Sequence, residues 1–236
     1  MNLFRCTAWA QRVALMLAAA GCVAAQAEPF GMTAALDRIK RGEPIRLGYR
    51  TNSPPLSFAR DGVAKGYTVD LCRAAVARMA RQLQRKDIAI IYVPVTIENR
   101  MTKVAAGEID MACGLTSNTV SRSKHVAFSP IVRVTGTKFA VIPGSALQSP
   151  QQLEGKVVAA GKGTTNLRSL TQYAADRALK LSVIETIDTK AAFTAVSRGT
   201  ASAAALNEIS AMGGCERSRK LPCDCWIDTC PPSRLR

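Results

Sequence analysis

The chain has 236 residues and a formal net charge of +15, and 47% of its residues are hydrophobic. After the first 27 residues about 209 remain, enough for one large domain or two small ones with a sizeable core. The basic excess would suit an anionic partner. The basic residues are scattered, however, and no basic run is interleaved with aromatic residues, so we do not expect nucleic acid as a partner.

The N-terminus has the features of a secretion signal in the required order. Arg5 and Arg12 are basic, an uncharged apolar stretch follows, and small residues stand at Ala25 and Ala27. The apolar stretch is too short for a permanent membrane span. We expect a signal peptide over 1–27, cleavage after Ala27 and export to the periplasm. The alternatives are a mitochondrial-type presequence, a buried helix, and a lipoprotein anchored at Cys22.

The next part of the chain alternates between strand-like and helix-like segments. Apolar residues recur at helical spacing from Cys72 to Leu83, and Gly107 stands where a helix commonly ends. In chain order we expect a strand at 45–50, a helix at 67–83, a strand at 88–93, a helix at 97–106, a strand at 109–113, and extended segments at 126–134 and 137–142.

A second unit of the same kind follows. We expect a strand at 156–160, a helix at 163–179, a strand at 181–185, a helix at 189–197 and a strand at 201–206. Alternating strands and helices predict parallel α/β units. Two such units joined near 134–136 predict two lobes with a cleft between them, where a ligand would bind beyond the carboxyl ends of the strands.

The composition changes at about Gly213. Residues 213–236 are rich in Cys, Arg and Pro and show no helix or strand period. We expect a disordered tail, read in a shifted frame; an ordinary flexible tail is the alternative. The Cys-Asp-Cys spacing at Cys223 and Cys225 does not match structural zinc sites, so no metal is expected. Cys72 and Cys113 could pair in an oxidising compartment, or stay free.

Several anion-binding groups are placed at the edges of loops. Thr164 and Thr165 open a helix whose amides and hydroxyls can hold a carboxylate. Arg122 follows a loop, Arg50 ends the first strand, and Arg100 lies in the helix after the second strand. An arginine fork can grip a carboxylate with two parallel hydrogen bonds. Each arginine alone could be a solvated surface residue, but together they indicate a site for an acidic ligand.

Catalytic groups are scarce by comparison. The single histidine, His125, has no nucleophile or metal cluster beside it, so we expect a packing or surface role. The sequence around Gly161-Lys162-Gly163 lacks the spacing of a phosphate-binding loop.

A series of ordered motifs resembles the bacterial periplasmic amino-acid-binding proteins of ABC transporters, and within them the glutamate/aspartate-binding branch. The resemblance covers roughly residues 33–212. Its motifs are Leu36-Asp37-Arg38-Ile39-Lys40, Gly66-Tyr67-Thr68-Val69-Asp70-Leu71-Cys72, Val95-Thr96-Ile97-Glu98-Asn99-Arg100, Gly107-Glu108-Ile109-Asp110, Cys113-Gly114-Leu115-Thr116-Ser117-Asn118, Val120-Ser121-Arg122, Ala127-Phe128-Ser129-Pro130 and Gly163-Thr164-Thr165.

The resemblance implies a two-lobed α/β fold, the periplasmic-binding-protein type II fold, that closes on its ligand like a hinge. It implies that Arg122 holds the α-carboxylate. It implies that Arg50 and Arg100 take the side-chain carboxylate of an acidic amino acid. The expected ligand-binding set is Arg50, Arg100, Thr116, Ser117, Arg122, Thr164, Thr165 and Thr189.

The sequence departs from that branch at several positions. Leu115 and Ile97 stand where serines are usual, Thr189 where a histidine is expected, and Asn207 where an aspartate is typical, with Glu208 beside it as a substitute. These departures weaken the case for glutamate or aspartate in particular but not for an amino acid. In the family, a cysteine at the position of Cys113 can also pair with one farther along the chain.

The residue patterns and the resemblance together imply a chain divided into a signal peptide (1–27), a first lobe (28–134), an incomplete second lobe (135–212) and an atypical tail (213–236). The return crossing and C-terminal helices are expected to be missing, so the chain is interpreted as truncated or frame-shifted. We expect a monomeric, non-enzymatic receptor that delivers a free amino acid to the permease of an ABC importer, without a cofactor. The alternatives are a periplasmic dehydratase with Glu208 as its candidate acid or base, a sensory module, and a non-functional product.

Overall fold

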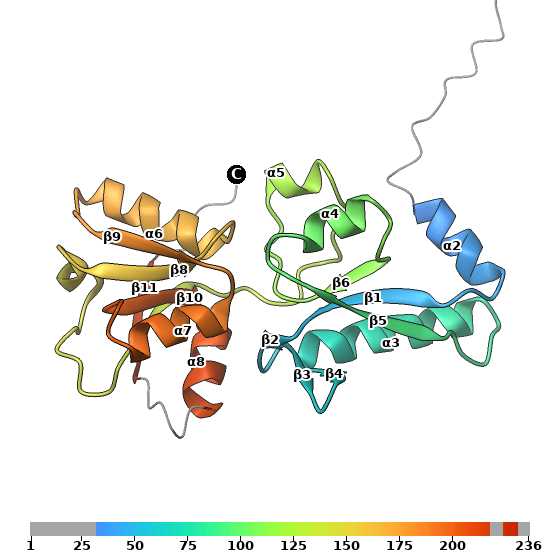
Figure 1. Cartoon of the computed structure of the whole chain (residues 1–236). Coiled ribbons are helices and arrows are strands. Elements are labelled where there is room, and N and C mark those ends of the chain that lie inside the picture. Colours follow the sequence, from blue (N-terminus) through green and yellow to red (C-terminus); the bar gives the residue numbers. More distant parts are fainter. Residues whose placement is uncertain (1–31, 218–223, 231–236) are drawn as a thin grey trace, which may run out of the picture.

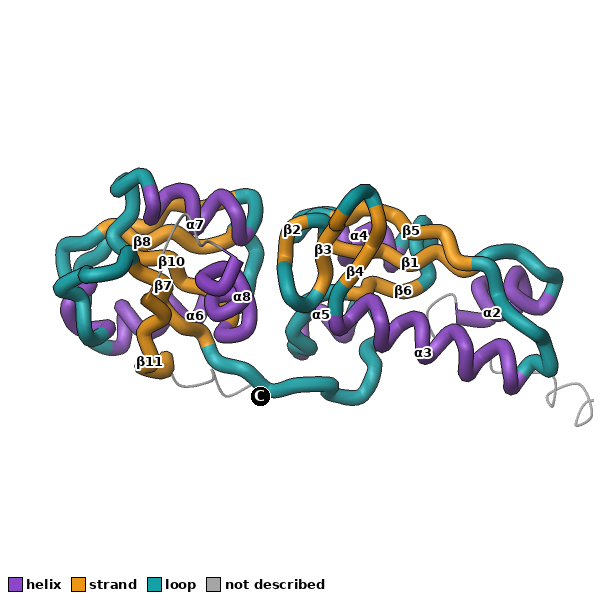
Figure 2. Tube along the Cα trace, turned by 90° about the horizontal axis from the view of Figure 1, so that it is seen from below, coloured by secondary structure: helices purple, strands orange, loops and turns teal. Residues whose placement is uncertain are grey.

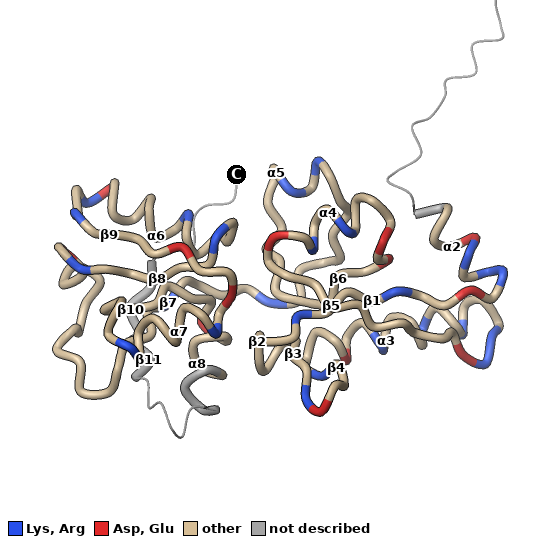
Figure 3. The backbone as a smooth tube through the Cα atoms, in the orientation of Figure 1, with Lys and Arg blue, Asp and Glu red and all other residues tan. Residues whose placement is uncertain are grey.

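The computed structural model describes residues 32–217 and 224–230, and the expected signal peptide lies outside them. The described residues form two α/β lobes joined by an extended connection (Figure 1, Figure 2). Lysines and arginines are spread along both lobes rather than gathered in one segment (Figure 3). No helix in the described ranges has the length and apolarity that a bilayer crossing needs.

The first lobe is built on a parallel sheet in which β1 (Ile45–Arg50) lies between β5 (Ile90–Val95) and β6 (Met111–Cys113). α3 (Tyr67–Gln82) packs its apolar stripe against this sheet, and the shared core includes Leu47, Tyr49, Val69, Cys72 and Val76. The other helices of this lobe are α2 (Met32–Lys40), α4 (Arg100–Ala105) and α5 (Val120–Ser123).

A small antiparallel sheet, which the sequence did not predict, connects β1 to α3. It consists of β2 (Asn52–Ser53), β3 (Ser57–Arg60) and β4 (Val63–Lys65). Gly66 follows it with φ of +122°, and a Cβ there would lie 2.5 Å from the carbonyl oxygen of Leu56. Only glycine tolerates this conformation and this approach. The turn therefore brings the start of α3 close to the end of β1.

The second lobe contains a five-stranded sheet in the order β11-β7-β10-β8-β9. Its strands are β7 (Thr137–Val141), β8 (Val157–Gly161), β9 (Ser182–Thr186), β10 (Ala203–Asn207) and β11 (Asp224–Cys230). The helical elements are η1 (Pro150–Leu153), α6 (Thr165–Asp176), α7 (Thr189–Ser197) and α8 (Glu208–Arg217).

Helices cover both faces of this sheet (Figure 2). Ala192 and Phe193 of α7 pack on one face in a cluster with Ala159, whereas Leu170 of α6 packs on the other face with Val158. Strands buried on both faces become continuous apolar runs, as the sequence shows at Val157–Gly161. The side chains of these alternating residues fix both helices, and hence their N-termini, at one edge of the sheet.

Most expected elements are present, with ends that differ by up to three residues from those expected. The helix expected over 97–106 begins only at Arg100, because Thr96 and Asn99 form reciprocal side chain-to-backbone hydrogen bonds of 2.8 and 3.1 Å that hold a turn. The segment 126–134 forms no strand. It has no neighbouring strand to pair with and leaves Ile131 73% exposed, so it serves as the connection between the lobes.

The prediction that no helix or strand follows Gly213 is wrong in two places. α8 continues through Gly213 to Arg217, and β11 pairs antiparallel with β7. Without β11 the outer edge of β7 would present unpaired backbone groups, which an added strand satisfies. The Cys-, Arg- and Pro-rich composition of residues 213–236 as a whole concealed a β-prone segment around Trp226 and Ile227.

A disulfide joins the helix and the sheet of the first lobe. Cys72 of α3 and Cys113 at the end of β6 are bridged, with their Cα atoms 6.1 Å apart. This separation lies within the range that a disulfide spans without backbone movement. The bridge lies next to the loop that follows β6, so it fixes the first residues of the candidate site.

Candidate ligand-binding site

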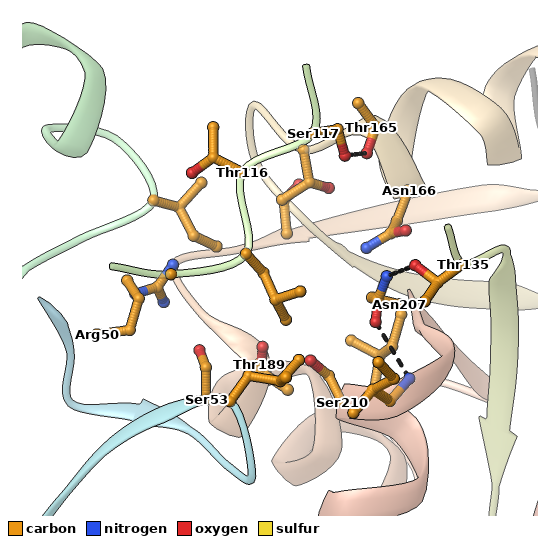
Figure 4. A pocket seen from close by; sticks show the side chains of 18 of the residues that line it. Arg50, Ser53, Thr116, Ser117, Thr135, Thr165, Asn166, Thr189, Asn207 and Ser210 are labelled. Atoms are coloured by element: carbon orange, nitrogen blue, oxygen red, sulfur yellow. Dashed lines mark hydrogen bonds between the residues drawn. The ribbon is translucent and has the colours of Figure 1, made fainter. Parts of the chain in front are cut away.

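One cavity between the lobes is lined by every residue of the predicted ligand-binding set (Figure 4). Its volume is about 160 Å³, below the roughly 300–1,000 Å³ of pockets for drug-sized ligands. The predicted residues that line it are Arg50, Arg100, Thr116, Ser117, Arg122, Thr164, Thr165 and Thr189. They come from the carboxyl ends of strands and from helix N-termini of both lobes, as expected for parallel α/β units.

Arg50 enters the cavity from the last position of β1 and is only 5% exposed. Ser57 fixes its backbone, since the Arg50 N–H donates a 2.8 Å hydrogen bond to Ser57 Oγ. The guanidinium Nη2 donates to Asn52 Oδ1 at 3.3 Å. Burial lowers the pKa of Arg50, and the charge of Asp188 in the second lobe partly offsets this effect. Arg50 is therefore a buried cation whose loss of hydration is only partly offset by the negative charge of Asp188.

Arg100 is the most strongly perturbed group of the site. It opens α4 and is 4% exposed, and its Nε finds no hydrogen-bond acceptor within the described part of the chain. Burial, together with the positive charges of Arg122 and Arg50, lowers the pKa of Arg100 to about 9. A buried charge without a partner is costly. An anionic ligand would supply the missing acceptor and the missing negative charge.

Arg122 spans the cleft. It lies in α5, whose N-cap Thr119 accepts a hydrogen bond from the Arg122 backbone N–H. Its Nη1 donates to the carbonyl oxygen of Ser117 and its Nη2 to that of Gly163, both at 3.0 Å. A guanidinium has five N–H donors, so the remaining donors are available to a ligand. Burial lowers the pKa of Arg122, and the nearby Arg168 lowers it further.

The second lobe contributes the N-terminus of α6. Thr164 caps this helix: its hydroxyl accepts from the Leu167 N–H at 3.2 Å and donates to the Gly161 carbonyl at 2.7 Å. Thr164 thus shapes the loop and has little hydrogen-bonding capacity left for a ligand. Thr165 Oγ1 instead lies 3.0 Å from Ser117 Oγ of the first lobe (Figure 4). The first turn of α6 also presents backbone N–H groups suited to an anion.

Two further predicted residues face the cavity. Thr116 Oγ1 is buried and has no hydrogen-bond partner among the described residues, so a ligand could use it. Thr189 begins α7, directly after the N-cap Asp188. Asp188 also accepts a hydrogen bond from Asn52 Nδ2 of the first lobe, which gives the two lobes a further contact.

Sequence reasoning did not assign several residues that line the cavity: Ser53, Tyr67, Thr68, Arg133, Thr135, Asn166 and Ser210. Arg133 lies on the connection between the lobes, and a connection that borders a cleft is the signal that could have identified it. Ser53 belongs to β2 of the small sheet that the sequence did not predict, so no signal placed it. Thr68 lies in the first turn of α3, a helix that was expected, but its role at the cavity was not assigned.

The charged side chains that line the cavity are all positive among the described residues. Arginines line it at Arg50, Arg100, Arg122 and Arg133, and no Asp or Glu of the described residues lines it. Glu208, named above as a substitute for an aspartate, begins α8 but is not among the lining residues. The position where the resemblance led us to expect an aspartate is occupied by the neutral Asn207, which does line the cavity.

Two α/β lobes that close a small, polar, electropositive cavity define the class of extracellular solute-binding proteins. The chain belongs to the bacterial extracellular solute-binding proteins, family 3, whose family model matches residues 45–209. This family also accounts for the order of the motifs along the chain.

Curated binding proteins are similar in sequence to this chain over most of its length. A glutamate/aspartate import solute-binding protein of Escherichia coli (strain K12) is 29% identical over 193 residues, covering 81% of this chain and 63% of that protein. An L-glutamate/L-aspartate-binding protein of Pseudomonas aeruginosa is 29% identical over 198 residues, covering 83% and 65%. The chain therefore spans less than two thirds of the length of these relatives.

Solved structures confirm the fold. An ancestral arginine-binding protein bound to arginine superposes with a TM-score of 0.69 at 22% identity, covering 80% of each chain. The arginine-bound truncated ArgBP from T. maritima gives a TM-score of 0.70 at 24% identity, covering 82% of this chain and 86% of that one. An ancestral amino acid-binding protein, described as a precursor of cyclohexadienyl dehydratase, gives 0.70 at 22% identity, covering 82% and 81%. The predicted periplasmic-binding-protein type II fold is thus correct.

Proposed function

We propose that this chain is a periplasmic solute-binding protein that captures a free acidic amino acid, of the glutamate/aspartate type, for the membrane permease of an ABC importer. The observation that carries the proposal is the buried cationic cavity, above all Arg100, whose Nε lacks an acceptor among the described residues. The names of the E. coli and P. aeruginosa relatives support the ligand class.

In this proposal the two carboxylates occupy different parts of the cavity. Arg122, Thr165 and the first turn of α6 hold the α-carboxylate, because they join an arginine fork to a helix N-terminus. Arg50 and Arg100 hold the second carboxylate, because both are buried and lie within electrostatic range of each other. Thr116 supplies a hydroxyl that the described residues leave unpaired.

Capture is proposed to proceed by hinged closure of the lobes. The hydrogen bonds between Ser117 and Thr165 and between Arg122 and Gly163 connect the lobes directly at the cavity. A ligand that contacts both lobes stabilises the closed arrangement through its differential affinity for it. Export is proposed to include cleavage after Ala27, which mass spectrometry of the periplasmic form would detect as an N-terminal Glu28.

Binding without turnover is favoured over a dehydratase-like reaction. Such a reaction needs a general acid or base in the cavity, and the described lining residues offer only arginines, hydroxyls, amides and apolar groups. The curated relatives above are named as binding proteins. Monomeric action and the permease partner belong to the proposal as well.

A ligand screen tests the proposal. Thermal-shift measurements of the mature chain with each of the twenty amino acids should show the largest stabilisation with glutamate or aspartate, because only ligands that bind the folded state raise its melting temperature. Product analysis with a prephenate-like compound should find no turnover. Stabilisation by none of the amino acids, or turnover of that compound, would overturn the proposal.

A further inference from the structure

We propose that this cavity recognises carboxylates without recognising an α-ammonium group, so that it takes small dicarboxylates lacking an amino group at least as well as the acidic amino acids. The inference rests on the proposed function, because it takes the same cavity as the ligand site. It narrows the chemistry of the ligand that the cavity selects.

The charged side chains that line the cavity are all cationic among the described residues. Arg50, Arg100 and Arg122 surround the cavity and Arg133 lies at its exposed rim, whereas no carboxylate of the described residues lines it. Each carboxylate of a ligand gains from these positive charges. An ammonium group enters the same field, in a site partly withdrawn from water, and is repelled. The amino group of an amino acid therefore reduces the favourable electrostatics instead of adding to them.

Asp188, a carboxylate outside the lining, offsets this positive field only in part. Its charge reaches Arg50, and each of its oxygens already accepts one hydrogen bond. Oδ1 accepts from the Ala191 N–H at 2.7 Å as the cap of α7, and Oδ2 accepts from Asn52 Nδ2. Asp188 and Glu208 both lie outside the lining of the cavity. An ammonium ion in the cavity would meet neither of them directly.

The side-chain amide of Asn207 is a second feature that disfavours an ammonium group. Its Oδ1 accepts a 3.1 Å hydrogen bond from the Ile209 N–H, and its Nδ2 donates to Thr135 Oγ1 (Figure 4). The side chain is thus oriented by its neighbours and carries no charge. The acceptors left for an ammonium are neutral oxygens such as those of Ser53, Thr116 and Ser210, and a neutral acceptor binds a cation less strongly than a carboxylate does.

The test compares matched ligands by titration calorimetry on the wild-type mature chain at pH 7.5. The pairs are L-glutamate with glutarate and 2-oxoglutarate, and L-aspartate with succinate; sulfate and phosphate test whether any small dianion suffices. We expect the amino-free dicarboxylates to bind within about threefold of the amino acids or more tightly. Glutamate and aspartate binding more than tenfold tighter than their amino-free partners would overturn the inference and leave the proposed function intact.

Two other outcomes of the titrations distinguish a failure of the inference from a failure of the proposed function. Sulfate or phosphate binding more tightly than every dicarboxylate would overturn the inference, since the site would then recognise a compact anion. Absence of binding by all acidic amino acids and all dicarboxylates, in a chain that melts cooperatively, would overturn both the inference and the proposed function.

A variant tests the cause. Asn207→Asp places a carboxylate in the cavity and should shift the preference toward glutamate over glutarate by tenfold or more. Gln151→Glu, at an exposed position of η1 that does not line the cavity, is the control that adds the same charge elsewhere and should leave the ratio unchanged. Circular dichroism shows whether both variants fold. If Asn207→Asp does not fold, the ligand affinities measured on the wild-type chain decide whether the inference holds. An unchanged ratio in folded Asn207→Asp would contradict the proposed cause.

Discussion

Arg122 of the first lobe donates a 3.0 Å hydrogen bond from Nη2 to the carbonyl oxygen of Gly163 in the second lobe. The same guanidinium lines the cavity. In the proposed function, ligand contact and lobe contact share this side chain, so a ligand that orients Arg122 should also favour closure. A second cross-lobe hydrogen bond, between Ser117 and Thr165, also lies at the cavity.

Arg122→Ala should lower the affinity of the protein for every ligand that has a carboxylate. Hydrogen bonds to charged groups contribute about 1.5–3 kcal/mol, so the dissociation constant should rise by roughly ten- to a hundred-fold or more. Calorimetry checks this, with Arg78→Ala on the exposed face of α3 as the control. An unchanged dissociation constant in a folded Arg122→Ala protein would remove Arg122 from the site.

Arg100→Met should abolish binding of dicarboxylate ligands and yet stabilise the ligand-free protein. Arg100 is buried, burial lowers its pKa to about 9, and its Nε has no acceptor among the described residues. Replacing this uncompensated cation with an apolar side chain should raise the free energy of unfolding by about 1–3 kcal/mol. Urea denaturation without ligand measures this change. A less stable variant with wild-type affinity would show that Arg100 has a structural role.

Arg50→Ala should affect acidic ligands far more than neutral ones. Only acidic ligands have a second carboxylate for the buried cations Arg50 and Arg100. We expect an at least tenfold larger loss of affinity for glutamate than for glutamine, from the lost charged hydrogen bond. Equal losses for the two ligands would mean that Arg50 only supports the fold.

Reduction of the Cys72–Cys113 disulfide should destabilise the first lobe. The bridge closes a loop with a sequence separation of 41, and a disulfide over such a loop contributes about 2–4 kcal/mol by restricting the unfolded chain. Urea denaturation of the Cys72→Ser/Cys113→Ser double variant measures the loss, and reductant should have no further effect through this pair. Free thiols at both positions of the unreduced protein would contradict the bridge.

Deletion of residues 218–236 should expose the outer edge of β7, because β11 pairs with that edge. Hydrogen exchange of the amides in Thr137–Val141 should then accelerate by about tenfold or more, since edge groups lose their partner. The amides of β8, which lies between β9 and β10, serve as the internal control. Equal exchange of β7 in the two proteins would show that β11 does not stabilise it.

The sequence predicted the elements that have strong periodicity or clear caps. The strand at 45–50 and the helix at 189–197 match β1 and α7 residue for residue. It did not predict the small sheet between β1 and α3, because two- to four-residue strands carry no measurable period. β11 has seven residues and was missed for a different reason, the unusual Cys-, Arg- and Pro-rich composition around it.

The predicted ligand-binding residues were brought together because arginines and hydroxyls at strand ends meet at one edge in α/β lobes. Their energetic state could not be predicted. The lowered pKa of Arg100 depends on its burial and on Arg50 and Arg122, which lie in other elements. The hydroxyl of Thr164 is used as the cap of α6, which depends on the local backbone geometry.

The most direct test of this account is a calorimetric titration of L-glutamate, glutarate, L-glutamine and L-lysine into the mature wild-type chain. We expect saturable, one-to-one binding of the two dicarboxylates, weaker binding of glutamine, and no binding of lysine, because the cavity is lined by arginines and by no described carboxylate. Preferential binding of lysine, or no binding of either dicarboxylate by a folded chain, would contradict it.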